Sequence, residues 1–92
     1  MIVEPVVVQG ESLTVPERLV VAPAAGTFTP RRPETVTAEG EIVRAGQVVG
    51  TVEGPGLSTP VRSPFTGFLM GMLANDGERV REGEPVAWLR LV

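Results

Sequence analysis

An internal repeat constrains the fold of this chain more than any other feature of its sequence. Residues 22–26 (APAAG) are followed by residues 40–46 (GEIVRAG), and residues 63–67 (SPFTG) are followed by residues 77–83 (GERVREG). Both copies share the pattern x-P-x-x-G and then G-E-x-V-R-x-G, and each copy continues into an apolar run. Such repetition predicts two interlocked halves of similar structure, which we expect to be related by a pseudo-twofold axis.

Short apolar runs separated by proline and glycine predict an all-β domain. The runs cover residues 19–21, 48–52, 68–73 and 86–91, and no stretch keeps a helical apolar period over three turns. Either half alone would have open sheet edges and half a core. We therefore expect two four-stranded sheets packed face to face as a flattened β-barrel, with Val43 and Val80 turned inward between their paired glycines.

The composition excludes several classes of function. The 92 residues, enough for one domain, include no cysteine and no histidine, and all eight basic residues are arginine. The commonest general base and metal ligands are therefore missing, and the carboxylates show no convergent spacing, so neither an enzyme nor a metal site is expected. The net charge is −3 without a basic patch, which argues against nucleic acid as a partner. No leader or membrane-length apolar run is evident, so a cytoplasmic location without membrane attachment is expected.

The motifs resemble the biotinyl/lipoyl carrier-domain family, and GTF at residues 26–28 resembles the carrier domain of acetyl-CoA carboxylase. Family members begin near S/A-P-x-x-G and continue with G-x-x-V-x-x-G-Q, which matches residues 40–47 here. A strand ending in Glu follows, here at Glu53, and a second copy of the turn motifs closes the domain. The resemblance implies the barrel-sandwich hybrid fold for residues 19–92. It leaves residues 1–18 as an N-terminal extension.

The chain departs from the family at the attachment turn. Biotin carriers have Ala-Met-Lys-Met where this chain has Gly54, Pro55, Gly56 and Leu57, so that Gly56 occupies the lysine position. Biotin and lipoate both attach through an amide to a lysine amine, and the sequence contains no lysine, so we expect neither cofactor. Pro55 fixes φ near −65° and bars the type I′ hairpin turn. Pro55 and Gly56 instead fit the central positions of a type II turn.

Two places are candidates for contacts with a protein partner. Between Phe28 and Gly40 the first copy is four residues longer than the second, and this stretch contains Arg31 and Arg32. The resemblance implies a protruding segment here. It is interpreted either as a proline-stiffened surface loop at residues 29–33 or as a docking element whose arginines meet an acidic partner.

The second place is the apolar group in the second half of the chain. Phe68 and Met70 occupy positions that are often polar in the family, so an exposed interaction surface competes with core packing for these two side chains. Leu69 and Met72 are expected in the core. Trp88 lies in the last apolar run and is expected to be core or half-buried.

Three functions remain open at this point. The first is a non-enzymatic, unmodified relative of the biotin carriers that serves as an interaction or assembly module. The second is a degenerate biotin carboxyl carrier-like subunit of an acyl-CoA carboxylase or a related complex. The third, an adaptor like those in membrane-fusion proteins, is disfavoured because no signal or long helix is evident. Residues 6–8 and 13–15 can pair as an extra hairpin, which would add strands within the chain or link copies into a homo-oligomer.

Overall fold

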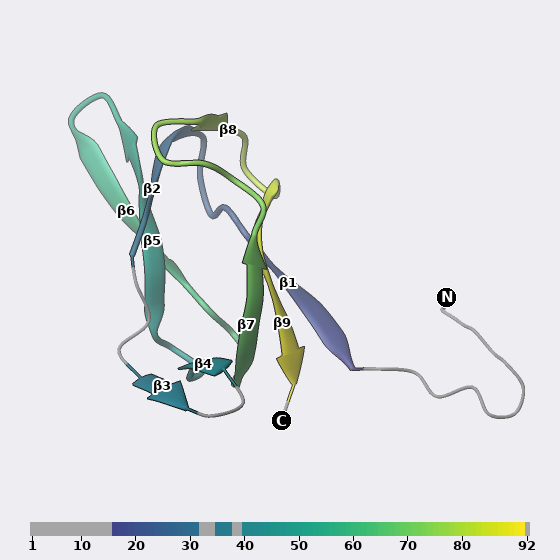
Figure 1. Cartoon of the computed structure of the whole chain (residues 1–92). Helices are drawn as coiled ribbons and strands as arrows, with labels where there is room; N and C mark the ends of the chain where they lie inside the picture. The colour runs from purple at the N-terminus through teal and green to yellow at the C-terminus, as the bar shows by residue number, and fades with distance from the viewer. Residues whose placement is uncertain (1–15, 32–34, 38–39, 92) are drawn as a thin grey trace, which may run out of the picture.

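The computed structural model describes residues 16–31, 35–37 and 40–91 and shows an all-β arrangement (Figure 1). No helix occurs among these residues, so the part of the chain that is described holds no segment able to cross a membrane as a helix. This confirms the predicted fold class. The strands are β1 (Glu17–Val21), β2 (Gly26–Pro30), β3 (Thr35–Thr37), β4 (Gly40–Val43), β5 (Val48–Gly54), β6 (Leu57–Arg62), β7 (Gly67–Met72), β8 (Arg79–Val80) and β9 (Pro85–Leu91).

The strands form two antiparallel sheets, with the orders β1-β9-β7-β4-β3 and β6-β5-β2-β8. Four strands were predicted for each sheet, but the first has a fifth because β3 pairs with the edge of β4, placing Thr35 opposite Ile42. The longer stretch of the first copy therefore contributes an edge strand. The surface loop expected at residues 29–33 is wrong for Thr29 and Pro30, which continue β2 and pair with β5, and residues 32 and 33 lie outside the described residues.

The pseudo-twofold relation between the halves is visible in the pairing of the strands. Exchanging β1 with β6, β2 with β7, β4 with β8 and β5 with β9 converts one sheet order into the other, with β3 left over. The register obeys the same exchange, since Leu19 lies opposite Trp88 in one sheet and Pro60 lies opposite Thr51 in the other. Each sheet contains strands from both copies, so the two halves are interlocked as predicted.

The core lies between the sheets and draws on both copies of the repeat. Val43 and Val80 are buried, as predicted from their position between paired glycines. Leu69 packs against the core, and Trp88 is half-buried. Met72 was expected in the core but is exposed, because it is the last residue of β7 and extends past the packed layer. The buried apolar residues are Val20, Ala22, Phe28, Val43, Val49, Val52, Val61, Ala74, Val80, Val86, Ala87 and Leu89.

The loops at residues 44–47 and 81–84, here called the glycine loops, are tied to the other half of the molecule by matching hydrogen bonds. The N–H of Gly46 donates to the carbonyl of Ser63 at 2.7 Å, and the N–H of Gly83 donates to the carbonyl of Ala22 at 2.7 Å. Each loop of one copy is thereby held to the turn that begins the other copy. The hairpin expected within residues 6–15 lies outside the described residues.

Candidate functional site

The candidate site is the turn that joins β5 to β6, at the tip of a hairpin that projects at the upper left of Figure 1. Gly54 lies opposite Leu57, which leaves Pro55 and Gly56 as a two-residue loop. Gly56 has a φ of 66°, the left-handed value that a type II turn requires at its third position. A proline at the second position supplies the fixed φ near −65° that the same turn requires. The turn therefore has the geometry that its sequence predicts.

The tip of this hairpin is exposed to solvent in the part of the chain that the structure describes. Pro55 and Gly56 are exposed, and Leu57 is the most exposed large apolar side chain described, at 64%. A Cβ built on Gly56 would meet no atom within 4 Å. Any side chain at position 56 would thus extend into solvent, which is the presentation that a carrier needs, yet glycine offers no amine there.

The residues below the turn make one polar contact across the hairpin. The Ser58 hydroxyl donates to Oε2 of Glu53 at 3.2 Å, and the two residues lie opposite one another in the register. Both side chains are exposed, so this contact contributes little to stability.

Two other carboxylates, those of Glu78 and Glu84, close loops. Oε1 of Glu84 accepts the N–H of Arg81 at 2.9 Å, and the amide Oε1 of Gln47 accepts the N–H of Arg44 at 3.0 Å at the equivalent place in the first copy. Glu78 accepts the N–H of Asn75 at 2.8 Å. Within the described ranges no three acidic, histidine or cysteine side chains gather as metal ligands. The glycine loops therefore show structural roles that sequence reasoning missed, although Gln or Glu directly after the last glycine of each copy was a visible signal.

The predicted partner contacts lie apart from the turn. Arg31 is exposed at the end of β2, where its N–H donates to the carbonyl of Val49 at 2.9 Å, and Arg32 lies outside the described residues. Phe68 is half-buried, and Met70 is 41% exposed at an irregularity of β7 where the register shifts. Phe68 and Met70 belong to β7 of the five-stranded sheet, whereas Arg31 follows β2 of the four-stranded sheet, which also contains the turn.

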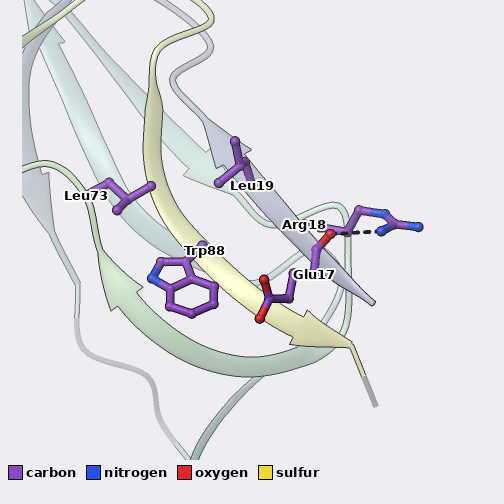
Figure 2. Close-up of a pocket in the computed structure, with 5 residues that line it drawn as sticks. All are labelled: Glu17, Arg18, Leu19, Leu73 and Trp88. Atoms are coloured by element: carbon purple, nitrogen blue, oxygen red, sulfur yellow. Dashed lines mark hydrogen bonds between the residues drawn. The ribbon is translucent and has the colours of Figure 1, made fainter. Parts of the chain in front are cut away.

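A hollow of about 360 Å³ lies on the five-stranded sheet and was not anticipated from the sequence (Figure 2). It is lined by residues of β1, by Leu73 just after β7, and by Trp88 of β9; the β1 residues are Glu17, Arg18 and Leu19. The hollow is shallow and mostly apolar, and its only charged groups come from the edge strand β1.

Comparison with known proteins defines the class to which this fold and turn belong. The biotinyl/lipoyl family model, described as "Biotin-requiring enzyme", matches residues 18–89. The chain therefore belongs to the biotinyl/lipoyl carrier-domain family. Domains of this family carry a cofactor and are not themselves catalytic. No curated protein matches the chain.

A solved structure supports the same fold. The chain superposes on part of a single-chain, multi-domain long-chain acyl-CoA carboxylase with a TM-score of 0.68 and 22% sequence identity. The match covers 88% of this chain but only 8% of the carboxylase, so this chain spans a small fraction of that protein. At this identity the likeness establishes the fold.

Proposed function

We propose that this chain is a non-enzymatic biotinyl/lipoyl-like domain that carries neither biotin nor lipoate and serves as an interaction or assembly module. The observation that carries the proposal is the turn at Pro55 and Gly56, which is solvent-exposed like an attachment site but contains no amine. Because the sequence contains no lysine anywhere, no other side chain supplies the missing group.

The exposed apolar side chains support a role in contacts with a protein partner. Leu57 stands at the tip of the β5–β6 hairpin, and Met70 stands on β7 of the other sheet. Apolar groups that remain exposed after folding lose contact with water only when a partner covers them. An acidic partner segment would in addition meet Arg31, which is exposed after β2, and Arg32, which follows it in the sequence.

The second candidate function is a degenerate carrier-like subunit of an acyl-CoA carboxylase or a related complex. The structural likeness to part of a long-chain acyl-CoA carboxylase favours this candidate. In such a complex the domain would occupy a carrier-like place without transferring a carboxyl group, because transfer requires the tethered cofactor.

Ligase treatment followed by intact mass measurement tests the absence of the cofactor. The purified chain is incubated with biotin ligase, biotin and ATP, and separately with lipoate ligase, lipoate and ATP. A genuine carrier domain in the same tube confirms that each ligase is active. We expect the mass of this chain to stay unchanged, and a gain equal to one biotinyl or lipoyl group overturns the proposal.

Co-purification separates the two candidate functions. The tagged chain is isolated from the cells in which it naturally occurs, and the bound proteins are identified. Recovery of biotin carboxylase and carboxyltransferase subunits in fixed ratio assigns the chain to a carboxylase complex. Recovery of a different partner in fixed ratio supports the assembly module outside carboxylases.

A further inference from the structure

The outer face of the five-stranded sheet is apolar at positions that the strand register places side by side. Leu19 lies opposite Trp88, and Phe68 lies opposite Ile42, on the side of the sheet away from the core. Their chain neighbours face inward: Val20 is buried beside Leu19, and Ala87 and Leu89 are buried on either side of Trp88. We call Leu19, Ile42, Phe68, Leu73 and Trp88 the apolar outer face.

The repeat supplies an internal reference for this face. The exchange of strands that relates the two sheets gives the four strand residues of the apolar outer face counterparts on the four-stranded sheet, where they pair in the same way. The counterparts of Leu19, Trp88, Phe68 and Ile42 are Pro60, Thr51, Thr27 and Arg79. The outer face of the four-stranded sheet thus has mostly polar residues at these positions, and only the five-stranded sheet has large apolar residues there.

Trp88 gives the apolar outer face its shape. A Cβ on Gly71 would lie 2.7 Å from Nε1 of Trp88, so the absence of that side chain lets the indole lie across β7. Leu19 and Leu73 line the hollow beside the indole (Figure 2), and they remain 51% and 49% exposed. The described part of the chain therefore leaves this hollow uncovered.

The size of the apolar outer face indicates what kind of occupant it fits. Four strands spaced about 4.8 Å apart, each contributing about five residues at about 3.4 Å rise, make a surface of roughly 330 Å². A stable interface between separate proteins buries about 800 Å² on each partner. A surface this small is better suited to a tethered segment, whose effective concentration is in the millimolar range for a short linker.

The chain contains such a segment, and the described residue that follows it, Pro16, lies at the edge of this sheet. Residues 1–15 lead into Pro16, whose carbonyl accepts the N–H of Leu91 at 2.8 Å and so fixes where the segment meets the sheet. The segment then continues into Glu17 and Leu19, which already line the hollow. Fifteen residues span at most about 50 Å when extended, more than the width of the face.

The composition of residues 1–15 suits contact with an apolar surface. Eight of these fifteen residues are apolar, and the charged ones, Glu4 and Glu11, are both negative. Arg90 lies on the same side of the sheet, opposite Phe68, with Glu17 3.5 Å away, and Arg18 lines the hollow. We propose that residues 1–15 dock on the apolar outer face and cover Trp88, with Val6 and Val8 among the residues that make the contact.

Trp88 is the only tryptophan in the sequence and reports directly on this contact through its fluorescence. Acrylamide quenching and the emission maximum are measured on the full chain, on V6E/V8E, and on the matched control Q9E/S12E, each over a hundredfold range of protein concentration. The control adds the same two negative charges to the same segment but leaves its apolar residues intact. Far-UV circular dichroism verifies that all three proteins keep the β-fold.

The tethered segment has an effective concentration in the millimolar range. If its dissociation constant for the face is also in that range, the face is covered about half of the time or more. We therefore expect V6E/V8E to raise the Stern–Volmer constant of Trp88 about twofold and to shift its emission to longer wavelength, while Q9E/S12E resembles the parent chain. Equal quenching of the parent and V6E/V8E overturns the proposal. An equal effect of Q9E/S12E also overturns it, as does protection of Trp88 that grows with protein concentration, since a second copy is then the occupant.

Discussion

At the tip of the β5–β6 hairpin, two adjacent residues determine which chemistry position 56 can perform. Gly56 adopts a φ of 66°, a conformation that costs an L-residue about 1–2 kcal/mol. No neighbouring atom obstructs a side chain there, so the barrier to a lysine lies in the backbone and not in steric contact. Pro55 adds to this barrier because its ring fixes the turn as type II.

The first prediction follows from that backbone barrier. G56K alone is expected to be labelled poorly by biotin ligase, because the amine is then present on a turn of the wrong type. G54A/P55M/G56K/L57M, which replaces the whole turn by the family motif, is expected to be labelled at least about tenfold faster, which corresponds to about 1.4 kcal/mol. Labelling rates of both variants at matched concentration provide the measurement. Equal rates would show that the turn type has little influence.

A different glycine, Gly67, is required by packing at the first residue of β7. A Cβ on Gly67 would lie 2.5 Å from the carbonyl oxygen of Arg90, a backbone atom that cannot rotate away. The counterpart Gly26 meets the carbonyl of Glu53 at the same 2.5 Å. The glycine that ends each x-P-x-x-G motif is therefore explained by close approach of two backbones.

We expect G67A to lower the free energy of unfolding by about 2 kcal/mol or more, since the two strands must separate to admit the methyl group. Its control is G54A, whose Cβ would make an ordinary contact at 3.7 Å with the carbonyl of Ala25. The control should change stability by less than about 1 kcal/mol. Urea unfolding followed by circular dichroism measures both, and a G67A protein as stable as G54A would contradict this explanation.

At the scale of elements, the two glycine loops are closed by the same device in both copies. The side chains of Gln47 and Glu84 each accept a backbone N–H three residues earlier, and the main-chain N–H of each residue donates back to the carbonyl of that same earlier residue. A neutral amide and a carboxylate thus perform one structural task at equivalent positions. The loops in turn hold Val43 and Val80 in the core.

Removing either acceptor should have a similar effect. Q47A and E84A are each expected to destabilise the domain by about 1 kcal/mol, the usual contribution of a hydrogen bond whose donor becomes exposed to water. E82A serves as the control, because Glu82 is exposed in the same loop and its counterpart in the first copy is already Ala45. Thermal unfolding midpoints rank the three variants. A loss in E82A as large as that in E84A would refute the assigned role.

At the scale of the whole molecule, stability depends on the exchange of strands between the two halves. β1 pairs with β9 and β5 pairs with β6, so one outermost pair of each sheet joins strands from different copies. β2 pairs with β8 and β4 pairs with β7 in the same manner. In either copy alone, every interior strand of the two sheets would lose at least one of its neighbouring strands.

Separated halves should therefore fail to fold. Residues 16–55 and residues 56–92, prepared individually, are expected to show no cooperative unfolding transition, because each half has open edges and half a core. Circular dichroism during urea titration gives the measurement, with the full chain as the reference. A cooperative transition in either half alone would mean that the interlocked strands are not required.

The sequence predicted those features that local chemistry or repetition determines. The repeat predicted the interlocked halves. The position of Val43 and Val80 between paired glycines predicted that both side chains are buried, and the pair Pro55 and Gly56 predicted the type of turn. The fifth strand was missed because the pairing of Thr35 with Ile42 depends on an open edge elsewhere in the sheet. Met72 was misplaced because apolar character alone does not show where a strand leaves the packed layer. The apolar outer face emerged only when the register allowed the two copies to be compared residue by residue.

The most direct measurement of the central claim is the intact mass of the chain isolated from the cells in which it naturally occurs, grown with ample biotin and lipoate. The account predicts a mass equal to that of the unmodified polypeptide, because Gly56 and the absence of lysine leave no amine at the attachment turn. A mass larger by one biotinyl or one lipoyl group would contradict it.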